Sequence, residues 1–331
     1  MLLVVVDVGE PSGDLHDDSI AGCTDKPDQL RPHASRFLPR RNLIMKRPAP
    51  TRRWHLRAAT IAATGLLAAL APISVVGAAR ADNGGDPPPK GANNWACRSA
   101  THPTPVVLVH GTTANQNQNW ATLSPALTDA GYCVYTFTYG VLPGLPGIGG
   151  LGPFAASVKR LAQFADTVRS RTGADKLDFV GHSQGAAVQM AYLRDYEGAK
   201  HARRVINFAG VVSGPPAGAL GGLLGLAPGA VGTVCPACAT LGDPATYRIV
   251  NYPNVQYVNI ASNTDEVVQP PSVSFMKPAP NVRNVLVQSY CPGMMVGHDA
   301  MSKNPTVRRI IMNGLDPATA QPVPCGPNDP F

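Results

Sequence analysis

A serine flanked by small residues is the side chain in this sequence best suited to act as a nucleophile. Ser183 lies in the pentapeptide GHSQG, after the apolar run KLDFV and before AAVQMAYLRDY, which has a helical pattern. A serine hydroxyl attacks a carbonyl group at neutral pH only when a neighbouring base accepts its proton. A tight turn from strand to helix would present the hydroxyl at the carboxyl edge of a sheet, with Gly181 and Gly185 allowing close packing. Because the chain has 33 glycines, the pentapeptide alone is weak evidence.

Two backbone N–H groups are candidates for stabilising a negatively charged oxygen. Gln184 would begin the helix after the turn, so its N–H points toward the oxyanion that forms when the serine attacks a carbonyl. The stretch PVVLVHGTTANQNQNW places Thr112 in the loop after an earlier strand. We expect the Thr112 N–H to be the second donor and interpret His110 as a packing residue that shapes the turn.

The base and the acid that orients it should follow the nucleophile, each on a loop after a later strand. In VQYVNIASNTDEVVQP, Asp265 and Glu266 come just after one apolar run, and in SYCPGMMVGHDAM, His298 comes after the next. All of these positions fall at the edge of the sheet where Ser183 is expected. The pattern leaves both carboxylates open as the orienting acid.

Six short apolar runs must form the elements that position these side chains. They read PVVLVHG, YCVYTFTYG, KLDFVGHS, RRVINFAGVV, VQYVNIAS and RNVLVQSY. Continuous apolar runs of this length are typical of strands buried on both faces, which favours a mostly parallel sheet. Between the second and third runs, PFAASVKRLAQFADTVRSRTG has apolar residues at helical spacing and ends at Gly173. The alternation predicts a doubly wound α/β fold.

Two apolar stretches interrupt this alternation. Residues 140–154 and 210–232 consist almost wholly of Gly, Pro, Leu, Ile, Val and Ala. They contain too much Gly and Pro for long helices and are apolar enough to avoid water. One interpretation is a pair of buried irregular loops, and the other is a mobile apolar rim, including Leu223, Leu224 and Leu226, that contacts acyl chains or a lipid surface.

The first part of the chain is expected to lie outside the folded product. Residues 45–81 have basic residues, an apolar stretch and a small-residue site, the three parts of an export signal, with cleavage after Ala81. Residues 1–44 are interpreted as an upstream extension or a disordered segment. Residues 82–96, rich in Pro, Gly and Asn, predict a flexible leader, and residues 97–331 predict one catalytic domain.

Export changes how the net charge is interpreted. Residues 51–56, TRRWHL, resemble a twin-arginine signal with histidine at the usual phenylalanine position, so the export route is open between the Sec and Tat pathways. The segment up to Ala81 holds 11 of the 28 Lys and Arg residues and 7 of the 21 Asp and Glu residues. The remaining chain is only weakly basic and has no basic stripe interleaved with aromatics, which argues against nucleic acid as a partner.

Cysteine usage agrees with an extracellular location, because six of the seven cysteines follow the expected signal. Six cysteines allow fifteen pairings, and proximity in sequence favours three local ones. These are Cys97 with Cys133, Cys235 with Cys238, and Cys291 with Cys325. A redox or zinc function for the CPAC motif is disfavoured, because no second Cys or His pair stands at ligand spacing.

Several of these motifs, taken in order, resemble the secreted bacterial lipases of the α/β-hydrolase superfamily called class 2 lipases, particularly the actinobacterial triacylglycerol lipase/esterase type. The matching stretches are PVVLVHGTTANQNQNW, TGADKLDFVGHSQGAAVQMAYL, CPAC, YVNIASNTDEVVQP and the GH before a final amphipathic segment. The resemblance implies the α/β-hydrolase fold, disulfides among the six cysteines and Asp265 rather than Glu266 as the acid. It implies this set of site residues: the triad Ser183, Asp265 and His298, and the oxyanion donors Thr112 and Gln184.

The expected function is therefore that of a secreted serine carboxylic-ester hydrolase that cleaves acylglycerols or related lipid esters, either dissolved or at a lipid–water interface. Alternatives on the same fold are a polyester or cutin hydrolase, an acyltransferase, or an inactive hydrolase-fold binding protein. The sequence departs from the family pattern at Ala186 and in the apolar stretch after the following strand, and neither departure touches the triad. The second leaves the acyl-binding pocket, and so the preferred acyl chain length, open. No cofactor is implied, and no metal is expected because no acidic loop has calcium-ligand spacing. A permanent membrane anchor is disfavoured because the apolar stretch of the export signal is rich in Ala and Gly and contains Pro72.

Overall fold

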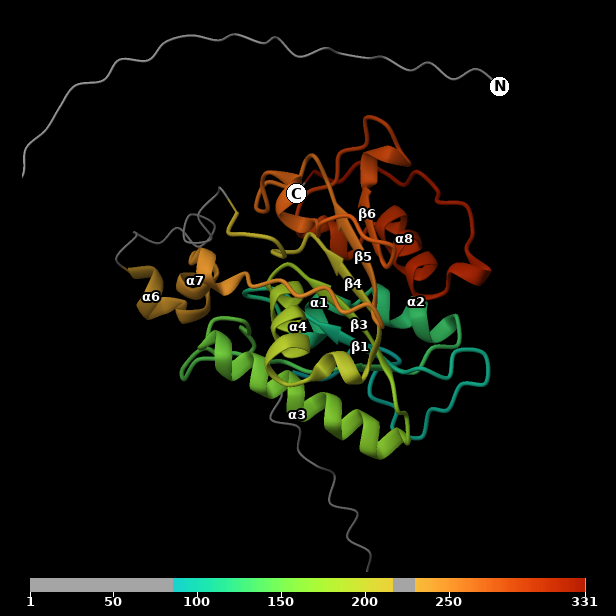
Figure 1. Cartoon of the computed structure of the whole chain (residues 1–331), viewed down its shortest axis with the longest axis horizontal. Coiled ribbons are helices and arrows are strands. Elements are labelled where there is room, and N and C mark those ends of the chain that lie inside the picture. The colour runs from blue at the N-terminus through green and yellow to red at the C-terminus, as the bar shows by residue number, and fades with distance from the viewer. Residues whose placement is uncertain (1–85, 217–229, 331) are drawn as a thin grey trace, which may run out of the picture. The chain divides into compact units, whose positions relative to one another are not determined.

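The computed structural model describes residues 86–216 and 230–330, and within them six strands form one parallel sheet (Figure 1). Their order across the sheet is β2-β1-β3-β4-β5-β6. The expected extension and export signal, residues 1–81, and the leucines at 223, 224 and 226 lie outside the described residues. The strands are β1 (Val106–Val109), β2 (Val134–Thr136), β3 (Leu177–His182), β4 (Ala202–Phe208), β5 (Gln256–Ala261) and β6 (Val282–Leu286).

Each of the six apolar runs overlaps one strand, and every neighbouring pair is parallel. All residues of β1 and β3, near the middle of the sheet, are buried, as expected for strands covered on both faces. The prediction of a mostly parallel, doubly wound α/β sheet is confirmed.

Helices connect the strands. They are α1 (Gln116–Trp120), α2 (Leu123–Asp129), α3 (Phe154–Thr172), α4 (Gln184–Asp195), α6 (Val231–Val234), α7 (Pro236–Leu241) and α8 (Pro305–Leu315). Short 3-10 helices are η1 (Gly198–Lys200), η3 (Pro244–Thr246), η4 (Pro271–Ser274), η5 (Val287–Ser289), η6 (Ala300–Ser302) and η7 (Pro317–Thr319). Helix α3 ends as predicted at Gly173, which has a φ of 75° and donates its N–H to the carbonyl oxygen of Arg169.

Alternating strand residues divide the core between the two faces of the sheet. Val107 on β1 packs in one hydrophobic cluster with residues of α3 and α4, whereas Val106 packs in a second cluster with residues of α2 and α8. Figure 1 shows these helix pairs on opposite sides of the strands. The period-2 alternation of side chains therefore gives helices an apolar surface to cover on both faces.

A row of asparagines crosses the sheet on the face that α4 covers. Asn207, Asn259 and Asn284 occupy paired positions on β4, β5 and β6. The Asn207 amide donates to Asn259 at 2.8 Å, and the Asn259 amide donates to Asn284 at 2.9 Å. Gln189 of α4 donates to Asn207 at 2.7 Å, and Asn284 donates to the carbonyl oxygen of Met276 at 2.7 Å. We call the three asparagines the asparagine ladder.

Residues 86–96 differ from the flexible leader that their composition predicts. Asn93 extends the edge of the sheet: its N–H donates to the carbonyl oxygen of Val134, and its side chain both donates to and accepts from the backbone of Thr136. The Trp95 ring packs on Tyr135, with centroids 4.9 Å apart. The edge strand thus gains hydrogen-bond partners and apolar cover, so the folded domain begins before residue 97.

Three disulfides join the cysteines in local pairs: Cys97–Cys133, Cys235–Cys238 and Cys291–Cys325. The first joins the segment after Trp95 to the start of β2. The third joins the loop after β6 to the C-terminal segment. Two of the three bridges therefore hold irregular segments against the sheet.

Candidate active site

Ser183 lies in a strained turn between β3 and α4. Its φ is 54° and its ψ is −121°, an unfavourable combination for a residue with a side chain. Helix α4 begins at the next residue, which leaves no room for a relaxed connection. Gly185 is required here, because a Cβ at this position would overlap the backbone carbonyl oxygen of Val109 on β1. The turn lifts the Ser183 hydroxyl above the carboxyl ends of the central strands.

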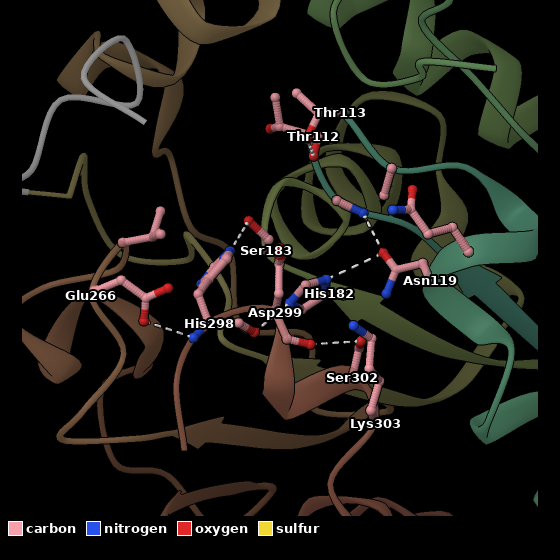
Figure 2. Close-up of a pocket in the computed structure, with 14 residues that line it drawn as sticks. Thr112, Thr113, Asn119, His182, Ser183, Glu266, His298, Asp299, Ser302 and Lys303 are labelled. Atoms are coloured by element: carbon pink, nitrogen blue, oxygen red, sulfur yellow. Dashed lines mark hydrogen bonds between the residues drawn. The ribbon is translucent and has the colours of Figure 1, made fainter. Parts of the chain in front are cut away.

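His298 and Asp265 complete a hydrogen-bonded chain that starts at this hydroxyl. Figure 2 shows the His298 ring next to Ser183. The Nε2 atom of His298 lies 2.8 Å from Ser183 Oγ. Its Nδ1 atom lies 3.0 and 2.9 Å from the two carboxylate oxygens of Asp265. All three residues are buried. A base in this position can accept the serine proton, and a buried carboxylate can stabilise the imidazolium that forms.

The two adjacent carboxylates have different contacts. Asp265 contacts the His298 ring and also accepts the backbone N–H groups of Val267 and Val268 at 2.9 and 2.8 Å. Glu266, the alternative acid in the sequence pattern, accepts the backbone N–H of His298 at 2.9 Å and does not contact the ring nitrogens. Asp265 therefore contacts the His298 ring, whereas Glu266 stabilises the backbone of the loop that contains His298.

Thr264 and the C-terminal segment also stabilise the His298 loop. Thr264, beside the acid, accepts the backbone N–H of Val296 at 2.8 Å and donates its hydroxyl to the Val296 carbonyl oxygen at 3.0 Å. The N–H of Gly297 donates to the carbonyl oxygen of Asp329 at 2.8 Å. The sequence patterns did not reveal this support, because Asp329 is in an irregular segment far along the chain.

Thr112 and Gln184, the two expected oxyanion donors, both lie next to Ser183. Thr112 lines the same pocket as Ser183 and His298, and Gln184 directly follows Ser183 at the start of α4. Among the residues that the structure describes, no acceptor bonds to either backbone N–H. Gly150 backs this region, with a φ of 73°, and a Cβ there would lie 2.6 Å from Gln184 Oε1 and 2.9 Å from Thr112 Cα. The apolar stretch 140–154 thus needs glycine where it packs against the turn.

A second histidine and an asparagine link the Thr112 loop to the His298 loop, and the sequence alone predicted a function for neither. Asn119 of α1 accepts the N–H of Gly111 at 2.9 Å through Oδ1, and the same oxygen lies 3.2 Å from His182 Nδ1. On its other side, His182 Nε2 lies 3.2 Å from the carbonyl oxygen of His298. The buried asparagine had no sequence signal of its own, because it follows a polar stretch at the start of a short helix.

Burial makes the remaining histidines of the site poor bases. It lowers the pKa of His110 to about 4. Burial and the adjacent His298 ring lower the pKa of His182 well below its usual range. His110 is held by the Gly111 carbonyl oxygen and by the N–H of Tyr139, which agrees with the expected packing function. His298 is therefore the ring that pairs with the serine.

The structure also describes part of the two apolar stretches. In residues 140–154, Leu145 and Ile148 are exposed while Gly149 to Gly152 are buried, and Gly149 donates its N–H to the carbonyl oxygen of Ala114 in the pocket wall. The middle of residues 210–232 lies outside the described residues. Within the described part of the chain, no helix is long and apolar enough to cross a membrane.

Comparisons with known proteins identify a family that matches part of the chain and solved structures with a similar fold. The family model for Lipase (class 2) matches residues 103–213. A search among curated proteins finds no match. Among solved structures, Aspergillus fumigatus lipase B matches with a TM-score of 0.51 and 18% identity, over 69% of this chain and 54% of that one. Mature Bacillus licheniformis lipase BlEst2 matches with a TM-score of 0.37 and 19% identity, over 55% of this chain and 71% of that one.

The match to lipase B shows a shared fold, and this chain spans about half (54%) of the length of that protein. The family match runs from the residues before β1 to those after β4, so it contains Thr112, Ser183 and Gln184. The expected resemblance is thus confirmed by a match that includes the nucleophile turn. Residues 103–213 thus match the class 2 lipase family model, and the parallel sheet shows that the chain has the α/β-hydrolase fold.

Proposed function

We propose that this protein is a carboxylic ester hydrolase that uses Ser183, His298 and Asp265 as a catalytic triad. The observation that carries the proposal is the 2.8 Å contact between Ser183 Oγ and His298 Nε2, together with the Asp265 carboxylate on the other ring nitrogen. Three buried side chains with this connectivity match the requirements of an activated serine.

In the proposed mechanism, His298 Nε2 accepts the proton of Ser183 as Oγ attacks the ester carbonyl carbon. The resulting imidazolium returns this proton to the alcohol oxygen as the carbon–oxygen bond breaks, which leaves an acyl group on the serine. Water then attacks the acyl-enzyme, with His298 again acting as the base, and releases the carboxylic acid. Asp265 holds the ring in the tautomer that leaves Nε2 free to accept a proton.

The backbone N–H groups of Thr112 and Gln184 are the proposed oxyanion donors. Their lack of acceptors among the described residues supports this function, because donors aimed at a developing charge must be free before the reaction starts. The start of α4 adds the positive end of a helix dipole at Gln184.

The proposed substrates are acylglycerols or related lipid esters, and the proposed location is extracellular. Exposed Leu145 and Ile148, in the segment that packs on the pocket wall at Ala114, are suited to contact an acyl chain or a lipid surface. Three disulfides are compatible with an oxidising compartment outside the cell. The export signal at residues 45–81 is the proposed route, with cleavage after Ala81.

Replacing Ser183 with alanine tests the proposed function. We expect kcat/KM for p-nitrophenyl butyrate to fall by at least about 10⁴-fold, because the nucleophile is lost. A fluorophosphonate probe should label Ser183 in the wild-type protein, as mapped by mass spectrometry, and should not label the variant. Ser170→Ala, an exposed serine on α3, serves as the matched control and should keep full activity. Retained turnover in Ser183→Ala, or labelling at another serine, would rule out this mechanism.

A further inference from the structure

The cavity above Ser183 is small and mostly polar. Its volume is about 230 Å³, at or below the lower limit typical of ligand pockets. Ala114 and Val267 are the apolar side chains among the residues that line it. Besides Ser183, His182 and His298, the polar or charged side chains around it, several of which Figure 2 labels, are Thr112, Thr113, Gln118, Asn119, Glu266, Asp299, Ser302 and Lys303.

Three of these polar side chains are available to a ligand. Asp299, Lys303 and Gln118 are exposed at the cavity. Across residues 86–216 and 230–330, no hydrogen bond or ion pair engages the Asp299 carboxylate, the Lys303 ammonium group or the Gln118 amide. In contrast, Glu266 already accepts the His298 N–H. The cavity therefore offers an unengaged acceptor, an unengaged donor and an amide that can act as either.

The position of His298 decides which half of an ester these groups would meet. The carbonyl oxygen faces the oxyanion donors, whereas the departing alcohol must lie next to His298 Nε2 to receive its proton. Asp299 directly follows His298, and Lys303 follows the short helix η6 that begins at the next residue. Figure 2 shows Asp299 beside His298, with Ser302 and Lys303 below them. Asp299 and Lys303 thus lie on the His298 side of the cavity, where the alcohol departs, and Gln118 of α1 lines the same cavity.

We propose that the alcohol half of the natural substrate carries free hydroxyl groups, as in a partial ester of glycerol or of a sugar. This inference rests on the proposed function and specifies its substrate class. A hydroxyl group can donate to Asp299 and accept from Lys303, so it satisfies both signs of charge. A fully acylated glycerol would bring an apolar chain against these exposed groups and displace their water without replacing its hydrogen bonds, which is costly for charged groups. The mixed charge also disfavours a cationic or an anionic alcohol.

Two esters with the same acyl group test the proposal. Glycerol monobutyrate has two free hydroxyls, and butyl butyrate has none. We expect kcat/KM for the monobutyrate to exceed that for butyl butyrate by about tenfold or more, the range expected of one or two hydrogen bonds to charged groups. Lys303→Met and Gln118→Leu should each reduce this selectivity ratio by about threefold or more.

The controls separate this proposal from the proposed function. Lys159→Met removes an exposed lysine on α3, away from the cavity, and should leave the selectivity ratio unchanged. Thermal unfolding should show that all variants are folded. Equal rates on the two esters, or a ratio that Lys303→Met does not alter, would overturn the hydroxyl proposal while leaving ester hydrolysis in place. Faster turnover of butyrylcholine than of the monobutyrate would overturn it in favour of a cationic alcohol. Failure to hydrolyse any of these esters would instead contradict the proposed function.

Discussion

The asparagine ladder and the catalytic edge are two buried polar regions of the same sheet with opposite hydrogen-bond balance. In the ladder, each asparagine donates to the next acceptor at 2.7 to 2.9 Å, and the backbone is that of ordinary strands. At the edge, Ser183 has a φ of 54°, and the N–H groups of Thr112 and Gln184 lack acceptors within the described residues.

This difference indicates that the asparagine ladder stabilises the fold, whereas the catalytic edge provides the groups that react. A satisfied ladder of amides is costly to disturb, and it favours the strand register that aligns the asparagines. A catalytic edge needs unused donors and a strained turn, which lower its own stability. The sheet core supplies the stability that allows the edge to remain strained. Changes in the two regions should therefore have separable effects on activity and on unfolding.

The largest expected effect is on activity at the edge. In Asp265→Asn, one side-chain oxygen can still accept the N–H groups of Val267 and Val268, so folding should be largely retained. The amide cannot stabilise the imidazolium or select the correct tautomer of His298. We expect kcat to fall by about 10⁴-fold, as measured with p-nitrophenyl butyrate.

Glu266→Gln is the matched control for that variant, because it changes the neighbouring carboxylate and keeps an oxygen for the His298 N–H. We expect a loss of less than about tenfold, because Glu266 supports the loop and not the ring charge. A larger loss in Glu266→Gln than in Asp265→Asn would reverse the assignment of the orienting acid.

The ladder should show the opposite behaviour. Asn259→Ala leaves the amide of Asn207 and the side-chain oxygen of Asn284 without their partners. We expect the free energy of unfolding to fall by about 4 kcal/mol, measured by urea denaturation, with kcat changed much less than in Asp265→Asn. Asn263→Ala, on an exposed loop, should change stability by no more than about 0.5 kcal/mol. Equal unfolding midpoints for the two variants would show that the ladder adds no stability.

Lowering the pH should reduce the free energy of unfolding through His110, near the catalytic edge, and not through the asparagine ladder, because asparagine does not titrate. Burial lowers the pKa of His110 to about 4 from 6.5, so the unfolded chain binds a proton more readily than the folded protein between these values. The contribution of neutral His110 to the free energy of unfolding is fully present above about pH 6.5 and is lost as the pH falls toward about 4.

The variant His110→Asn tests this origin of acid sensitivity. Between pH 7 and pH 4, the wild-type protein should lose about 3 kcal/mol more of its unfolding free energy than the variant. Urea denaturation at several pH values measures the difference. The same loss with pH in both proteins would show that His110 is not its source, and would leave His182, whose pKa is also lowered, as the candidate.

Much of the fold was predictable because its signals are local. Runs of buried β-rich residues marked each strand, and Gly173 marked the end of α3, where the backbone needs a positive φ. The site was predictable to the extent that it depends on the same rule. Parallel strands end at one edge of a sheet, so residues just after β3, β5 and β6 were expected together, and the structure brings Ser183, Asp265 and His298 into contact.

Other features left no periodic signal. Residues 86–96 had the composition of a solvated leader, yet Asn93 pairs with the edge strand through contacts more than 40 positions away. Asn119 is one polar residue in a polar stretch, and its importance comes from the Gly111 and His182 atoms around it. Such contacts depend on where irregular segments meet in space, and local propensity does not encode that.

The sequence by itself determined the order of strands and helices, the nucleophile turn and the residues that can reach one edge of the sheet, because these follow from hydrophobic period and backbone propensity. The residue pattern left Asp265 and Glu266 open and the family resemblance favoured Asp265, but only the tertiary structure shows which of them contacts the His298 ring and which polar groups face the cavity. Adjacent residues at a loop point in different directions, and a difference of a few ångströms separates a catalytic contact from a supporting one.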